Sequence, residues 1–313
     1  MNVFSLKDKI FKQAYSLGFS ACGITSVKEV NEVCRSHFDK WLQEGKDAQM
    51  QYMRNYKDKR FDPHLLVEDA RSILVVALNY YPRIRIPESH PQFALYAYGQ
   101  DYHTIIKEKL NELFSFINTL IPINGKIFCD TAPIMERYWA QQAGIGFIGK
   151  NTQLIIPGKG SFFFLGEIIS SLELPWDIPM QNKCGHCKRC IEQCPTQALI
   201  PGDFTTLDSN KCISYQTIEN KAAIPFKIAS KINNKVYGCD TCQKVCPWNK
   251  FSTPTTVPEF EPSEEFLSLD REKLKNMTHE DFNRIFKKSA VKRAKYEGLM
   301  RNINILSKNK SES

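Results

Sequence analysis

Two sets of closely spaced cysteines are the residues of this chain best suited to chemistry. The first set has gaps of two, two and three residues and comprises Cys184, Cys187, Cys190 and Cys194, with Pro195 directly after it. The second set has gaps of two and three residues and comprises Cys239, Cys242 and Cys246, with Pro247 directly after it. Thiolates with these gaps, ending in Cys-Pro, are typical ligands of 4Fe–4S clusters. The pattern therefore predicts a protein that transfers electrons.

The second set is one cysteine short, and Cys212 lies upstream to complete it. In ferredoxins with two clusters, the fourth cysteine of a run binds the other cluster. The spacing thus predicts a first cluster held by Cys184, Cys187, Cys190 and Cys246. It predicts a second cluster held by Cys194, Cys212, Cys239 and Cys242. The alternative is a pair of structural zinc sites, which the spacing of the first set matches poorly.

The composition indicates a globular protein of a reducing compartment. The 313 residues are 42% hydrophobic, which suits about two domains with buried cores. The longest aliphatic run covers residues 73–78 and is too short for a membrane span, and the first residues lack an export signal. Where thiols stay reduced, closely spaced cysteines hold metal more often than they form disulfides. We therefore expect a cytoplasmic monomer without membrane contact, in which Cys22, Cys34 and Cys129 are buried thiols.

The pattern of apolar residues divides the chain into three parts. Residues 1–178 alternate helical and strand-like segments, which predicts an α/β or α+β domain with a sheet covered by helices. The expected helices cover 7–17, 102–121 and 134–143, and the expected strands cover 73–78, 126–129, 154–156 and 162–165. Residues 179–252 predict a domain like a bacterial ferredoxin with two 4Fe–4S clusters. Residues 253–313 begin with a proline-bearing linker and continue as a short helical tail.

A glycine-rich segment at 144–151 resembles two nucleotide-binding motifs. Both motifs need a strand before the glycines and a helix after them. Here a predicted helix comes before and a predicted strand after, and Asn151 stands where a P-loop has a hydroxyl. The segment therefore does not predict nucleotide binding. Its glycines allow close backbone approach, and Lys150 is placed to meet an anionic or amide-bearing group.

Asp130 is a candidate general acid, because it lies where a predicted strand passes into a helix. Burial among its apolar neighbours would raise the pKa of the carboxyl, whereas a helix N-terminus would lower it. The alternative is an aspartate that caps the helix. Glu136 and Arg137, which follow, are expected to form structural salt bridges. In a second polar segment, Asp101 can cap a helix, and His103 is more often structural than a ligand.

The net charge of +8 is a mild excess, but basic residues gather near the end of the chain. From Arg284 to Lys310 there are nine basic residues and one acid, Glu297. Such a cluster can neutralise phosphates. The alternative is a solvated basic helix.

Taken together, these segments resemble the epoxyqueuosine reductases, the cobalamin-dependent iron–sulfur enzymes of queuosine synthesis. The resemblance covers nearly the whole chain, and its most specific parts are Asp-x-x-Pro-x-x-Glu-Arg at 130–137 and the glycine segment. The matching segments are 96–103, 130–137, 143–152, 211–219, 238–249 and 289–294, together with both cysteine sets.

The resemblance implies that residues 1–178 bind cobalamin and that the clusters reduce its cobalt. Low-valent cobalt would then remove the epoxide oxygen of epoxyqueuosine at the wobble position of tRNA, leaving queuosine in the last step of its synthesis. The electrons would come from a reductant protein that the sequence does not identify. Asp130 matches the proposed proton donor of the family. The implied cobalamin contacts are Tyr96, Asp101, His103, Gly149, Lys150 and Asn151. The implied tRNA contacts are Lys287, Lys288, Lys292, Arg293 and Lys295.

Two alternatives belong to other classes of protein. Reductive dehalogenases combine cobalamin with two clusters by resemblance, but they usually carry a twin-arginine export signal, which this sequence lacks. A ferredoxin-like electron carrier fused to a binding domain is the other alternative. It leaves Asp130, the glycine segment and the basic segment without a shared purpose.

Overall fold

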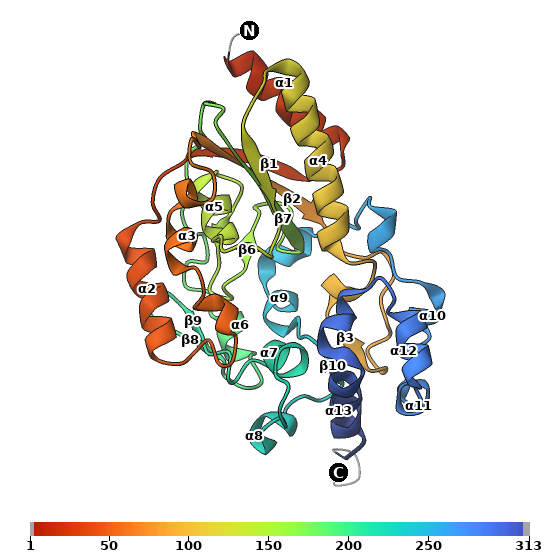
Figure 1. The fold of residues 1–313 in the computed structure, drawn as a ribbon. Coiled ribbons are helices and arrows are strands. Elements are labelled where there is room, and N and C mark those ends of the chain that lie inside the picture. The colour runs from red at the N-terminus through yellow and green to blue at the C-terminus, as the bar shows by residue number, and fades with distance from the viewer. Residues whose placement is uncertain (1–2, 309–313) are drawn as a thin grey trace.

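The computed structural model describes residues 3–308, and an antiparallel sheet of four strands lies at its centre (Figure 1). The strands, in sheet order, are β1 (Ala21–Ser26), β2 (Ser72–Asn79), β7 (Phe163–Ser170) and β4 (Gly125–Phe128). The two central strands, β2 and β7, are almost entirely buried, as expected of continuous apolar runs in the middle of a sheet. All the ladders of this sheet are antiparallel, so the first part of the chain is α+β.

Helices cover both faces of the sheet. On one face lie α1 (Val3–Ser16) and α4 (Tyr102–Leu120), which run side by side in Figure 1. Apolar residues of α4 meet β7 so closely that a Cβ on Gly166 would lie 2.9 Å from Ile106 and 3.0 Å from Leu110. The other face packs against α5 (Glu136–Gln142), and α2 (Glu32–Gln43) and α3 (Lys57–Phe61) complete that core. The expected helix over 134–143 is α5.

Several expected elements have different limits in the structure. The strand expected at 162–165 continues to Ser170, because the apolar run extends through the centre of the sheet. The strand expected at 154–156 is β6 (Leu154–Ile155), which pairs only with β5 (Phe147–Ile148) and lies outside the main sheet. The first strand of the sheet, β1, is absent from the expectations.

The cysteine-bearing part consists of short elements joined by turns. They are α6 (Arg189–Glu192), β8 (Leu199–Ile200), β9 (Thr206–Leu207), α7 (Ile213–Ile218), α8 (Phe226–Ala229), β10 (Lys235–Tyr237) and α9 (Thr241–Lys244). Strand β10 pairs in parallel with β3 (Gln92–Phe93), so this part shares a sheet with the first part of the chain.

The C-terminal part is helical, as expected, and packs into the same core. Its helices are α10 (Glu264–Leu267), α11 (Arg271–Lys275), α12 (His279–Ile285) and α13 (Lys295–Lys308). In α13, buried Asn302 donates from Nδ2 to the carbonyls of Thr217 and Val236, both at 2.8 Å. The expected linker is also held, because Thr255 Oγ1 donates to the carbonyl of Asn79 at 2.7 Å. One continuous apolar cluster runs through all three parts.

The short 3-10 helices connect these elements. They are η1 (Gln51–Met53), η2 (Pro63–Leu65), η3 (Leu95–Ala97), η4 (Pro247–Phe251), η5 (Pro258–Phe260) and η6 (Ala290–Ala294). Lys310, the last member of the basic run, lies outside the described residues. Between residues 3 and 308, no helix combines the length and the apolar character that crossing a membrane requires.

Candidate functional site

The cysteines surround two cavities in the sets that their spacing predicts. A cavity of about 280 Å³ is lined by Cys184, Cys187, Cys190 and Cys246. A second cavity, of about 430 Å³, has on its walls Cys194, Cys212, Cys239 and Cys242. Within residues 3–308, no three His, Cys, Asp or Glu side chains converge on one point as the ligands of a single metal ion would. The sulfur atoms of each set instead surround a volume.

Hydrogen bonds reach the sulfur atoms of both sets. The backbone N–H of Lys150 points at Cys184 Sγ at 3.4 Å, and that of Ala198 points at Cys194 Sγ at 3.2 Å. The Lys150 ammonium donates to the carbonyls of Gly185 and Cys187 at 2.6 and 3.1 Å. Lys150 therefore lines the cavity of the first cysteine set and not the larger cavity. Its ammonium is hydrogen-bonded to the loop that carries Cys184 and Cys187.

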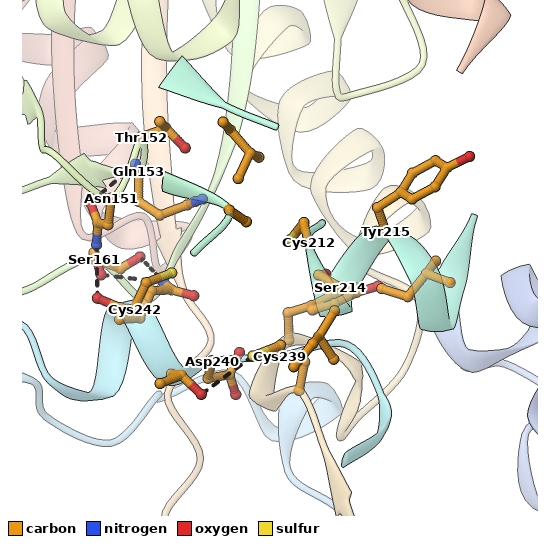
Figure 2. A pocket seen from close by; sticks show the side chains of 18 of the residues that line it. Asn151, Thr152, Gln153, Ser161, Cys212, Ser214, Tyr215, Cys239, Asp240 and Cys242 are labelled. Carbon is orange, nitrogen blue, oxygen red and sulfur yellow. Dashed lines mark hydrogen bonds between the residues drawn. The ribbon is translucent and has the colours of Figure 1, made fainter. Parts of the chain in front are cut away.

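The two cavities meet at the end of the glycine segment. Asn151 is 2% exposed, lines both cavities, and donates from Nδ2 to the carbonyl of Cys242 at 3.3 Å. Gly149 lines neither cavity, and it is needed for packing, because a Cβ there would lie 2.5 Å from Ile155. Figure 2 shows Asn151, Thr152 and Gln153 on one wall of the larger cavity, with Cys212 on another.

Asp130 stands on the wall of the larger cavity, two residues after β4 ends. Its backbone has a left-handed φ of 56°, and its N–H donates to Glu136 Oε1 at 2.5 Å. Its Oδ2 accepts a hydrogen bond from the Tyr102 hydroxyl at 2.6 Å and lies 3.1 Å from His103 Nε2. The alternative that Asp130 caps the following helix is wrong, since α5 begins at Glu136 with Met135 as its N-cap.

His103 links Asp130 to a second carboxylate. Its Nδ1 lies 2.6 Å from Asp101 Oδ1, and Asp101 also caps α4, as expected. Burial acts to lower the pKa of His103, but hydrogen bonds to Asp101 and Asp130 outweigh it and raise the pKa to about 9. Burial acts to raise the pKa of Asp130, but hydrogen bonds from His103 and Tyr102 hold it below its usual value. At neutral pH the proton of this pair therefore sits on His103 and Asp130 is a carboxylate.

Two further carboxyl groups lie behind Asp130. Burial and the negative charge of Asp130 raise the pKa of Glu136 to about 7. Glu167, in the middle of β7, is fully buried, and neither of its carboxyl oxygens has a hydrogen-bond partner within the described structure. Burial, with the charges of Glu136 and Asp130, raises the pKa of Glu167 well above its usual value. Its neutral form is therefore favoured over the carboxylate. Neither glutamate forms the salt bridge expected for Glu136, and Arg137 donates instead to the carbonyl of Thr152.

Aromatic side chains form the wall between Asp130 and the second cysteine set. Tyr96 lines the cavity and shares a hydrogen bond of 3.1 Å with the hydroxyl of Tyr237. Tyr102 stacks on Phe164 with ring centroids 4.1 Å apart, and Tyr80 lies 4.4 Å from the same phenylalanine ring. The site thus places an ionised acid beside its proton-bearing partner, across an aromatic-walled cavity from four thiols.

Comparison with known proteins identifies the family that has this arrangement. A family model described as a 4Fe-4S double cluster binding domain matches residues 183–249, and one described as epoxyqueuosine reductase QueG, DUF1730, matches residues 60–131. The epoxyqueuosine reductase of Cellulophaga algicola is 44% identical over 300 residues, which make up 96% of this chain and 97% of that protein. The chain belongs to the epoxyqueuosine reductase family.

Solved structures of epoxyqueuosine reductases have the same fold. A crystal structure of one with an epoxyqueuosine-modified tRNA stem loop superposes with a TM-score of 0.89 at 30% identity, covering 97% of this chain and 81% of that one. A structure of the Bacillus subtilis epoxyqueuosine reductase, with a TM-score of 0.88 at 30% identity and 82% of that chain covered, has an aspartate-bearing catalytic loop swung out of the active site. The fold inferred from the resemblance, a mixed domain with a double-cluster domain, is therefore confirmed in outline.

In this member of the epoxyqueuosine reductase family, the predicted tRNA contacts do not lie on one helix. They follow α12, occupy η6 and begin α13, and all five are exposed: Lys287, Lys288, Lys292, Arg293 and Lys295. The guanidinium of Arg293 is already paired with Glu219, through two hydrogen bonds of 2.9 and 2.8 Å. Its charge is therefore less available to a phosphate than the charges of the four lysines.

The sequence interpretation missed two residues of the site. Tyr102, whose hydroxyl donates to Asp130, belongs to the matching segment 96–103, but only the fold brings α4 beside the end of β4. Glu167 carried a readable signal, since it is one carboxyl in the apolar run Phe-Phe-Phe-Leu-Gly-Glu-Ile-Ile at 162–169. A single acid in a strand buried on both faces is rare unless it has a partner or a proton.

Proposed function

We propose that this oxidoreductase reduces epoxyqueuosine to queuosine at the wobble position of tRNA, the last step of queuosine synthesis. The observation that carries the proposal is the larger cavity, which has Asp130 on one wall and four predicted cluster ligands on another. Family membership names the substrate, and the crystal structure of a related enzyme with a modified tRNA stem loop supports RNA as the partner. An electron carrier would have no use for the acid at the cavity wall.

The two cysteine sets would hold two 4Fe–4S clusters, each bound by four thiolates. The first set does not line the cavity of Asp130, whereas the second set does. Electrons from an outside reductant protein would therefore pass from the first set to the second and then into the cavity. The N–H groups that point at Cys184 and Cys194 would stabilise the charge on the sulfur ligands.

The larger cavity fits cobalamin in its chemistry. Its walls are aromatic at Tyr80, Tyr96 and Phe164, which suits the flat face of a corrin, and hydroxyl and amide groups around Asn151 suit the amides at its edge. When bound, cobalamin would supply a cobalt centre that takes up electrons one at a time and acts on the epoxide. Tyr96 and Asn151 remain the candidate contacts, whereas Gly149 and Lys150 lie elsewhere and Asp101 acts through His103.

The protein side chains would supply one of the two protons. Removing the epoxide oxygen as water consumes two electrons and two protons, and Asp130 Oδ2 is the group at the cavity wall that can deliver a proton. Because His103 carries the proton in the free protein, Asp130 receives it from His103 Nε2, 3.1 Å away, as it donates to the substrate oxygen. Asp101 keeps the imidazole oriented through Nδ1. The exposed lysines of η6 and its flanks would hold the phosphates of the anticodon arm.

The test is turnover of the cluster-loaded protein with a strong chemical reductant, cobalamin and tRNA that contains epoxyqueuosine, followed by nucleoside analysis. We expect wild type to form queuosine. Asp130→Asn should retain iron and bound cobalamin yet lose turnover by about a hundredfold or more, the scale typical of a lost general acid.

Glu112→Gln is the matched control, because Glu112 is an exposed carboxylate on the same helix as His103. It should turn over like wild type. Unchanged turnover by Asp130→Asn would remove Asp130 from the chemistry, and absence of queuosine with loaded wild type would refute the proposed function.

A further inference from the structure

Residues 50–59 present two exposed tyrosines beside the cavity of Asp130. Met50 lines the cavity, and the side chains of Tyr52 and Tyr56 are 46% and 67% exposed. Burial raises the pKa of Tyr52 to about 12, and the charges of Glu219 and Asp130, both on the cavity wall, contribute to it. Tyr52 is therefore a neutral phenol two residues after Met50, and Tyr56 follows four positions later in the chain.

Basic residues of the C-terminal part lie directly beside Tyr52. The guanidinium carbon of Arg293 lies 5.8 Å from the ring centroid of Tyr52, and Glu219 fixes the orientation of that guanidinium through two hydrogen bonds. Lys221 donates to the carbonyl of Arg293 at 2.9 Å, and it lies close enough to Lys295 for the two charges to repel. A polyanion that binds at this surface therefore meets an aromatic ring and cationic groups together.

The segment that carries Tyr52 is held in place by hydrogen bonds. Arg54 forms hydrogen bonds of 2.7 and 2.6 Å with the carboxylate of Asp47, which is fully buried, and one of 2.9 Å with the carbonyl of Leu42. The carbonyl of Tyr52 accepts a hydrogen bond from Arg60 at 3.2 Å, while the backbone before it is tied to α7 through the hydroxyl of Tyr215. A surface ordered before binding loses little conformational entropy when a ligand stacks on it.

Charge at the second tyrosine also suits RNA. The Lys59 ammonium lies 5.4 Å from the ring centroid of Tyr56, and Lys59 is exposed. A cation beside an exposed aromatic ring can neutralise a phosphate while a base stacks on the ring. Unpaired bases of RNA loops are recognised in this way, by stacking on aromatic side chains.

We propose that Tyr52 and Tyr56 form a stacking platform for unpaired nucleotides of the tRNA anticodon loop that flank the modified nucleoside. The proposal rests on the proposed function, and it adds an RNA contact from the N-terminal part of the chain beside the basic C-terminal part. The phosphates would lie toward Lys221 and Lys59, and the bases against the two rings.

The experiment measures binding of fluorescently labelled RNA to cluster-loaded protein by anisotropy at fixed salt. One probe is an anticodon stem–loop, and the other is a fully paired RNA of equal length. Tyr52→Ala and Tyr56→Ala should each weaken binding of the stem–loop by about 5- to 100-fold, the range for loss of one stacked base, and leave binding of the paired RNA unchanged. Tyr52→Phe, which keeps the ring, should bind the stem–loop within about twofold of wild type.

Tyr15→Ala is the matched control, because Tyr15 is 50% exposed on α1, at the far end of the molecule in Figure 1. It should bind like wild type, and every variant should retain wild-type iron content. Equal stem–loop binding by Tyr52→Ala, Tyr56→Ala and wild type would overturn the platform. Equal losses on both probes would also overturn it, since they indicate a charge effect. If wild type still forms queuosine, these results leave the proposed function standing.

A protein reductant is the other partner that could use this surface. Slower turnover of the tyrosine variants with a protein donor, normal turnover with a chemical reductant and unchanged RNA binding would assign the surface to that donor and refute the RNA platform.

Discussion

Replacing Glu167 with glutamine should stabilise the protein by an amount that grows with pH. In the unfolded chain a glutamate has a pKa of about 4.3. In the fold, burial raises the pKa of Glu167 well above that value. Between the two pKa values the native protein binds one proton more than the unfolded chain, so the free energy of unfolding falls by about 1.4 kcal/mol per pH unit. The contribution of Glu167 is complete below about pH 4.3 and is lost as the pH rises toward the folded pKa.

Glutamine has nearly the same shape and no proton to lose, so the variant lacks this pH dependence. The assay is urea unfolding of the cluster-loaded protein without oxygen, followed by tryptophan fluorescence, because Trp139 is fully buried on the sheet face that α5 covers. As the pH rises from about 6 toward the folded pKa of Glu167, the difference in free energy of unfolding between variant and wild type should shift in favour of the variant by up to about 1.4 kcal/mol per pH unit. Because the charge of Glu136, whose pKa is raised to about 7, is one cause of the raised pKa of Glu167, the interaction between the two carboxyls is part of this difference.

Exposed Glu112→Gln serves as the control and should differ from wild type by the same small amount at both pH values. The reasoning would be refuted if the difference for Glu167→Gln did not change with pH. That result would mean that Glu167 is ionised in the fold and paired with a cation.

Two further predictions concern the acid and the clusters. In wild type, kcat/KM should fall as the pH rises through about 9, because His103 then loses its proton. The His103→Gln variant should retain its iron but show no such fall in kcat/KM. The same fall in both proteins would assign it to another group. Cys212→Ser should bind about half the iron of wild type by metal analysis, whereas Cys34→Ala, at a cysteine outside both sets, should bind all of it; full iron in Cys212→Ser would remove Cys212 from the second site.

The cysteine sets were predictable because their information is local. Gaps of two and three residues fix which thiols share a loop, and the crossing of Cys194 and Cys246 follows from the same motif. The structure brings each set of four around one cavity. The helices α4 and α5 were similarly readable from apolar periodicity.

The environment of Asp130 was not predictable, because it depends on which elements the fold brings together. Tyr102 and His103 are 28 and 27 positions away in sequence, yet their hydrogen bonds decide that Asp130 is ionised. From the sequence, burial was expected to raise the pKa of Asp130 and a helix N-terminus to lower it. In the structure, hydrogen bonds from His103 and Tyr102 lower this pKa, and no helix N-terminus lies at Asp130. The position of Lys150 was not predictable for the same reason, since only the fold shows that the Cys184–Cys187 loop lies against it.

The packing of α13 also affects how the protein is made. Asn302 donates to the carbonyls of Thr217 and Val236, which lie between Cys212 and Cys239 in sequence, and Arg301 donates to the carbonyls of Gln216, Asn220 and Ala222. These contacts join segments about 65 to 85 positions apart, so they form only after α13 has left the ribosome. While the chain is still on the ribosome, Cys239 and Cys242 have emerged but the helix that closes their scaffold has not. Delivery of iron and sulfide to the second cysteine set is therefore expected to follow the emergence of α13.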